Sequence, residues 1–286
     1  MWRAGLVLVG LCSVAYAKDP PDVAAIKALI AQEADVLEQG GDGTDPKVFT
    51  QAAMTSSPDS DISSHERGGL RTMVSGYLVE LKPSGVKVGI SRDGQSAWVT
   101  FAAATSTACD SCESSPGPAL RSSQLVVKVG SAWLVQTSMW SIGTADAKVN
   151  KDAKAGKQQE PEDVGDADAG DASVRAALAT LVTKGFDPAL AKTKLLVGIG
   201  SAPKEIVAFS ALVPFFNKSW VGKLTVDGPV WASVAPSGTT AAAMANVSLK
   251  KTEGKATFEV SFRWFVVFDK DVAGVWQPIH VHFAVR

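Results

Sequence analysis

The chain contains 286 residues, of which 46% are hydrophobic and 20% are charged, and its formal net charge is −1. Because one compact core usually organises roughly 100 to 200 residues, this length predicts two domains. The balanced charge excludes the electrostatic footprint needed to bind nucleic acid or an anionic membrane, so neither is expected as a partner.

The first 17 residues are typical of a secretory signal peptide. Arg3 precedes an apolar stretch from Ala4 to Val14, and the small-residue motif "AYA" ends at Ala17, where we expect cleavage. A membrane anchor is the alternative, but the apolar stretch is shorter than the roughly 20 residues that span a bilayer core. We therefore expect an exported protein, periplasmic or secreted, with no membrane span.

Two cysteines remain after the signal peptide, Cys109 and Cys112, in the segment "ACDSCESSPGP". In an oxidising compartment, two cysteines this close are expected to form a disulfide that ties the loop. A redox motif of the thioredoxin kind would open a helix after a strand, and a zinc site would need a second pair of ligands. The sequence around these cysteines supplies neither.

Residues 144–171 are rich in Lys, Asp, Ala and Gly and contain no aromatic residue. Such a segment buries too little apolar surface to order itself, so it predicts a flexible linker. It separates a first domain at residues 18–143 from a second domain at residues 172–286.

The two flanks of the linker follow the same order of elements. Each begins with a segment of helical periodicity, followed by an Asp-Pro pair at Asp45 or Asp187, a second helical stretch ("LRTMVSGYL" or "EIVAFSALVPFF") and a run of strands. The two aspartates are expected to cap short helices at the second residue after them. Each half closes with a hairpin whose last strand begins with a tryptophan.

The spacing between equivalent landmarks is nearly constant. Asp187 follows Asp45 by 142 residues, Gly238 follows Gly94 by 144, and Trp276 follows Trp133 by 143. This constancy predicts a tandem repeat of one domain rather than a solenoid, whose units hold roughly 20 to 50 residues.

These elements resemble the SnoaL-like branch of the nuclear transport factor 2-like superfamily. The resemblance lies in the turn "DGQSAW" at residues 93–98, and in a closing strand of the form W-x-x-x-H-x-H, matched by Trp276, His280 and His282. It implies α+β, cone-shaped tandem domains, each a curved antiparallel sheet wrapped around two or three helices with a cavity inside. The halves differ at these landmarks: the first carries Thr137 and Met139 in place of the histidines, and the second carries Ala242 in place of Trp98.

The final hairpin can also be interpreted without the family. If Phe268 faces Val275, then His280 lies opposite Arg263 and His282 opposite Ser261, and one face of the hairpin becomes wholly apolar. The histidines then lie on the other, half-polar face. Two imidazoles spaced by two residues on a strand could hold a metal with Glu259 as third ligand, but the fixed charge of Arg263 disfavours a cation, and we predict no metal and no cofactor.

Superfamily members that isomerise or cyclise substrates place an acid–base pair inside the cavity, which makes His280, His282 and Glu259 the candidate catalytic residues. Tyr77 and Arg263 are the candidate ligand-binding residues. An alternative is that the half-polar face packs against the other domain, as a pseudo-dimer that buries Phe265, Val267 and Trp276; a homodimer is the intermolecular version of the same contact.

Three functions remain open from the sequence. The first is a noncatalytic exported protein with two cavity-bearing domains that binds a small ligand or a protein partner. The second is an isomerase- or cyclase-like enzyme that uses the second domain's cavity, and the third is a structural or assembly module that uses the outer faces of the sheets. No nucleophile elbow, phosphate-binding glycine loop or zinc-protease motif occurs in the sequence.

Overall fold

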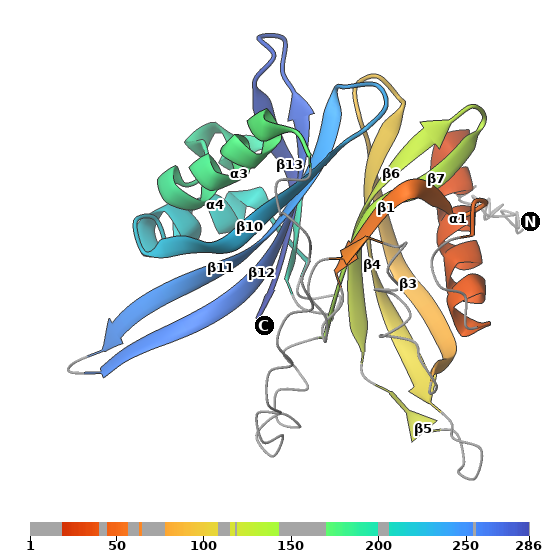
Figure 1. Ribbon diagram of the computed structural model, residues 1–286, viewed down its shortest axis with the longest axis horizontal. Helices are drawn as coiled ribbons and strands as arrows, with labels where there is room; N and C mark the ends of the chain where they lie inside the picture. Colours follow the sequence, from red (N-terminus) through yellow and green to blue (C-terminus); the bar gives the residue numbers. More distant parts are fainter. Residues whose placement is uncertain are drawn as a thin grey trace, which may run out of the picture.

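Two sheets, each carrying its own helices, make up the protein (Figure 1). The computed structural model describes residues 19–39, 45–56, 63–64, 78–107, 115–117, 119–142, 170–199, 206–253 and 256–285. The predicted α+β class, with two curved sheets that each pack on helices, is confirmed. None of the helices within these ranges has the length and apolar character needed to cross a membrane.

The first half forms a seven-stranded sheet and one described helix. Its elements are α1 (Pro21–Glu38), β1 (Phe49–Ser56), β2 (Ser63–Ser64), β3 (Leu78–Ile90), β4 (Ser96–Thr107), β5 (Ser115–Pro116), β6 (Leu120–Val129) and β7 (Ala132–Ile142).

The second half forms a six-stranded sheet with two α-helices and a short 3₁₀ helix. Its elements are α3 (Ala172–Lys184), η4 (Pro188–Lys192), β8 (Leu196–Ile199), β9 (Ile206–Ala208), α4 (Phe209–Ser219), β10 (Leu224–Val234), β11 (Thr240–Glu253), β12 (Ala256–Lys270) and β13 (Trp276–Val285).

The two sheets share one strand order. The first runs β2-β1-β7-β6-β4-β3, and the second, read from its other edge, runs β9-β8-β13-β12-β11-β10. In each sheet the closing strand pairs in parallel with the first strand of the half, β7 with β1 and β13 with β8, and the other pairs are antiparallel. Two chain segments with the same mixed topology support the tandem repeat that the constant spacing predicts.

The sheets face each other, and the helices lie on the outside (Figure 1). Side chains of successive residues alternate between the two faces of a strand. In β6, Val126 packs with α1 in the first core, whereas Leu125 and Val127 pack with Phe265 and Val267 of the second half. Both faces are therefore buried over the central strands of each sheet, and a third apolar cluster joins the two halves.

The predicted pseudo-dimer contact is present, with one exception. Phe265 and Val267 are fully buried in the cluster between the sheets, as expected. Trp276 instead packs in the second half's own core, and its indole N–H donates to the hydroxyl of Ser173 on α3.

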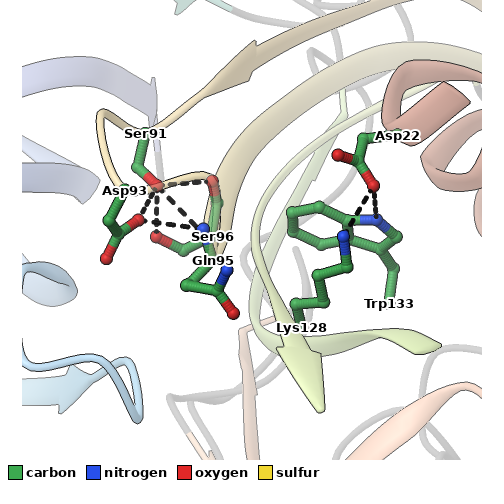
Figure 2. Close-up of polar contacts among 7 residues, drawn as sticks. All are labelled: Asp22, Ser91, Asp93, Gln95, Ser96, Lys128 and Trp133. Atoms are coloured by element: carbon green, nitrogen blue, oxygen red, sulfur yellow. Dashed lines mark hydrogen bonds and ion pairs between the residues drawn. The ribbon is translucent and has the colours of Figure 1, made fainter. Parts of the chain in front are cut away.

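The two equivalent hairpin turns, β3–β4 and β10–β11, meet at this interface. Figure 2 shows the first of them, in which the Asp93 carboxylate accepts hydrogen bonds from the Ser91 hydroxyl at 2.6 Å and from the Gln95 backbone N–H at 2.9 Å. Its other oxygen accepts from the hydroxyl of Thr239 in the second turn. Partial burial opposes ionisation, but these hydrogen bonds lower the pKa of Asp93 to about 2, so a carboxylate links the two turns.

Other local predictions can be placed on the structure. Asp45 and Asp187 accept hydrogen bonds from the backbone N–H groups of Lys47 and Ala189, the second residue after each, and Asp187 caps η4 as expected. The second helix expected in the second half is α4. Its counterpart is expected at "LRTMVSGYL", residues 70–78, of which the structure describes only Leu78, the first residue of β3. Tyr77, the pair Cys109 and Cys112, the signal peptide and most of the linker also lie outside the described residues.

Candidate functional site

His280 and His282 lie on β13, on the face of the second sheet that packs against the first sheet, and both are fully buried. This is the face predicted from the sequence, but the partners differ. His280 is opposite Val267 and His282 is opposite Phe265, four residues along β12 from the expected Arg263 and Ser261. Because four is an even number, the shift leaves the side chains of residues 280–284, which follow the bulge in β13, on their predicted faces.

The loop of the hairpin explains the shift. The Asp271 carboxylate accepts hydrogen bonds from the backbone N–H groups of Ala273 and Val275, which closes a turn tighter than the expected one. Ile279 then bulges out of the ladder, because Phe268 is opposite Pro278 and Val267 is opposite His280. The residues of β13 before the bulge therefore point to the opposite face from the one that simple alternation predicts. This bulge is also why Trp276 faces the second core and not the other domain.

The imidazole of His280 makes three contacts, two of them with the first half. Its Nδ1 lies 2.9 Å from the carbonyl oxygen of Leu196, which can only accept, so Nδ1 carries the proton. Its Nε2 lies 2.9 Å from the hydroxyl of Ser123, and its ring stacks on Trp98 with centroids 4.8 Å apart. His280 therefore joins the two sheets through hydrogen bonds and ring stacking at once.

His282 makes the neighbouring contact. Its Nε2 lies 2.9 Å from the hydroxyl of Ser141 on β7, and Gly198 on β8 lies beside its ring. The first sheet approaches closely here, because a Cβ added at Gly198 would lie 3.3 Å from Cδ of the buried Arg121.

Burial keeps both histidines neutral. Burial lowers the pKa of His280 to about 3, and the nearby positive charge of Arg121 acts in the same direction. Burial, His280 and Arg121 together hold the pKa of His282 well below its usual value. A sealed imidazole that stays neutral and has no access to solvent acts as a polar contact between domains.

Glu259 and Arg263 are not opposite the histidines in the sheet. Glu259 is exposed and lies opposite Lys250 in the β11–β12 ladder, and the described part of β13 ends opposite Phe262, three residues short of Glu259. Arg263 is buried opposite Ala284, with Nε 3.3 Å from the Asn246 side-chain oxygen. Within the described ranges no three His, Cys, Asp or Glu side chains gather as a metal site. The catalytic and ligand-binding roles of these residues stay predictions.

A different buried polar group lies inside the first domain. Glu33 on α1 is 1% exposed, and both of its carboxyl oxygens accept from the Gln124 side-chain amide, at 2.9 and 2.7 Å. The same amide also donates to the hydroxyl of Ser122 at 3.2 Å. Burial raises the pKa of Glu33 to about 7, although the hydrogen bond from Gln124 opposes this.

Each sheet has an inner face, the one that packs against the helices of its own half, and the two inner faces differ strongly at equivalent positions. The ladders align Thr55, Ser138, Gln124, Ser122 and Trp140 of the first half with Val197, Val281, Val266, Trp264 and Phe283 of the second. Thr55 and Ser138 share a hydrogen bond of 2.9 Å in the first half. The second half has apolar side chains at all five of these positions, and they pack on an aromatic cluster that includes Phe216 and Trp220.

Solved structures with a related arrangement are found, whereas no protein-family model and no curated protein match the sequence. One is an NTF2-like protein with a cystatin-like fold from Novosphingobium aromaticivorans, with 11% identity and a TM-score of 0.37 over 46% of this chain and 89% of that one. A protein of unknown function from Mycobacterium tuberculosis has 15% identity and a TM-score of 0.38 over 47% and 80%. The protein Aln2 from a Streptomyces species has 12% identity and a TM-score of 0.40 over 47% and 98%.

The sequence contains a signal for Glu33. The buried face of α1 is formed by Ile26, Leu29, Ile30, Glu33, Ala34 and Leu37, so the glutamate occupies an apolar position of the helical period. A charged residue at such a position is rarely buried without a partner, and it marks a polar site inside the domain.

Proposed function

We propose that the protein is an exported, noncatalytic binding protein made of two SnoaL-like domains, in which the first domain binds a small ligand in its interior and the second has a packed apolar interior. The observation that carries this proposal is the polar inner lining of the first sheet around Glu33, set against the apolar lining of the second sheet at the same positions.

The lining offers groups that a ligand can engage. The side-chain oxygen of Gln124 and the indole N–H of Trp140 are buried, and neither has a hydrogen-bond partner in the part of the chain that the structure describes. A buried polar atom without a partner costs roughly 1–3 kcal/mol, which a ligand that supplies the missing donor or acceptor recovers. Of the five second-domain residues aligned above, Trp264 is the one with a buried polar atom that lacks a hydrogen-bond partner among the described residues, its indole N–H.

The geometry of the histidines supports the noncatalytic role. An acid–base residue must reach its substrate and exchange a proton near the working pH. His280 and His282 lie outside the second domain's core, covered by the first sheet, and burial keeps their pKa values far below neutral.

Native mass spectrometry of the exported protein tests the binding role. We expect a copurifying small molecule that is retained by Asp35→Asn, a control at an exposed carboxylate of the same helix, and lost in Glu33→Gln. A clean apo mass for the wild-type protein, or an adduct that persists in Glu33→Gln, would contradict the proposal. The same spectrum tests export, because cleavage after Ala17 gives a mature chain that begins at Lys18.

The second candidate is an isomerase- or cyclase-like enzyme, and the pKa of Glu33 is the observation that favours it. A carboxyl with a pKa of about 7 can give or take a proton at neutral pH. NMR of the recovered ligand incubated with fresh protein decides between the two, because a chemical change that disappears in Glu33→Gln would establish the enzyme, in the first domain rather than the second.

A further inference from the structure

The first turn of each domain's leading helix contacts the hairpin tryptophan of the same domain. In the first half, Asp22 is the second residue of α1, and one of its oxygens accepts from the Lys128 ammonium at 2.9 Å and from the Trp133 indole N–H at 3.1 Å. Figure 2 shows this carboxylate contacting both side chains. Lys128 also lies over the Trp133 ring, 5.4 Å from its centroid.

The second half repeats this arrangement without the carboxylate. Lys270 and Trp276 are cross-strand partners, as Lys128 and Trp133 are, and Lys270 lies 4.5 Å from the centroid of the Trp276 ring. The second residue of α3 is Ser173, whose hydroxyl accepts from the Trp276 indole N–H at 2.9 Å.

The ammonium of Lys270 consequently has no ion-pair partner among the described residues. The nearby carboxylates are used elsewhere. Asp171 accepts from the backbone N–H groups of Ser173 and Val174 as the cap of α3 and influences Lys270 only at longer range, and Asp187 caps η4.

A groove opens at this point of the second half. It has a volume of about 560 Å³ and lies between α3 and the β12–β13 hairpin. Its apolar lining includes Ala177, Leu181, Phe268, Val275, Trp276 and Pro278. Two charged residues line it as well, Lys270 and Asp187, and the Asp187 carboxylate accepts a hydrogen bond from the Ala189 backbone N–H as the cap of η4. Val275 is 53% exposed although it is apolar, so the groove presents an apolar wall beside an unneutralised cation.

We propose that this groove binds a small apolar carboxylate, whose carboxyl group pairs with Lys270 in the role that Asp22 has toward Lys128 in the first half. The groove has the size of small-molecule sites, which commonly hold roughly 300 to 1,000 Å³. The Lys270 ammonium, which has no ion-pair partner among the described residues, favours an anionic group, and the apolar walls favour a hydrocarbon body of moderate length. The site is separate from the first-domain lining around Glu33 and stands independently of it.

Isothermal titration calorimetry with octanoate tests the site, with octanol and octylamine as probes of the same chain length. We expect octanoate to bind one per chain, and to bind more tightly than either matched probe. Lys270→Gln should weaken octanoate binding by about tenfold, as expected for the loss of one charge-assisted contact. Lys128→Gln, the equivalent change in the first half, should leave it unchanged.

Ser173→Asp gives the sharper test, because it places the first half's carboxylate beside Lys270. An acidic residue in the first turn suits the helix dipole, so the variant should fold. We expect octanoate binding to be lost in Ser173→Asp and kept in the uncharged control Ser173→Asn. No octanoate binding to the wild type, equal binding of the three probes, binding that survives Ser173→Asp, or binding that depends on Glu33 instead of Lys270 would each overturn the proposal.

Discussion

Replacing His280 by threonine, the residue at the equivalent position of the first half, isolates the contribution of the buried imidazole to the stability of the interface. The folded-state pKa of His280 is about 3, against 6.5 for the exposed side chain. Below pH 6.5 the unfolded chain binds a proton that the folded protein excludes, so stability is full above that pH and is lost as the pH falls toward 3.

The magnitude follows from the size of the shift. Each unit is worth about 1.4 kcal/mol, so the whole shift corresponds to about 5 kcal/mol, of which about 3 kcal/mol falls between pH 6.5 and pH 4. The wild-type protein should lose this contribution of His280 to the free energy of unfolding on acidification, and the His280→Thr variant, which lacks the imidazole, should not. The variant also loses the ring stacking on Trp98. This loss lowers its free energy of unfolding by an amount that does not change with pH.

Urea denaturation at several pH values between 4 and 7.5, followed by tryptophan fluorescence, measures the two free energies of unfolding. The difference between wild type and His280→Thr should shrink by about 3 kcal/mol from pH 6.5 to pH 4. A difference that is constant over this range would refute the placement of a neutral, buried imidazole between the sheets.

Three further predictions concern other parts of the chain. Glu33 has a raised pKa of about 7 against 4.5, so the stability of the wild type relative to Glu33→Gln should fall by about 3 kcal/mol as the pH rises from 4.5 to above 7; no change in denaturation measurements would contradict its burial. Gly198→Val should overpack the interface beside Arg121 and cost about 2 kcal/mol in thermal or urea unfolding, and a variant as stable as wild type would show that the sheets are further apart. If Cys109 and Cys112 are bonded, the intact mass of the purified protein should be two hydrogens below the mass calculated for the reduced chain, and it should rise by two hydrogens on reduction; an unchanged mass would exclude the disulfide.

The faces of the strands could be predicted from the sequence because alternation requires only the period of two. Val281 and Phe283 had to share a face with Trp264, whatever their partners were. The register could not be predicted, because it depends on how Asp271 closes the loop and on a bulge at Ile279, and neither leaves a pattern in the sequence.

The interior of the first domain was missed for a different reason. The periodicity of α1 identifies the apolar side chains of its buried face, and Glu33 lies at a position of that same face. Its partner Gln124 is 91 residues away on another element, and no local pattern connects the two. Only the alignment of the two ladders shows that the polar lining belongs to one half.

The interface between the halves is asymmetric, which two fused copies allow and a symmetric dimer does not. The ladder positions that hold Trp98 in one half and His280 in the other are occupied by Ala242 and Thr137 at their equivalents. In a symmetric dimer of identical halves, the two equivalent contacts would hold the same pair of residues. The large rings of Trp98 and His280 therefore meet at one contact between the halves, and the smaller Ala242 and Thr137 occupy the equivalent positions.

A double-mutant cycle on this pair tests the packing of the two sheets most directly. Trp98→Ala and His280→Thr each give one half the residue found in the other, and the free energies of unfolding of wild type, single and double variants yield the coupling between the two rings. We expect a coupling of about 1 kcal/mol, the size found for stacked ring pairs in contact. Strictly additive losses would mean that the two rings do not touch and that the halves do not pack through these faces.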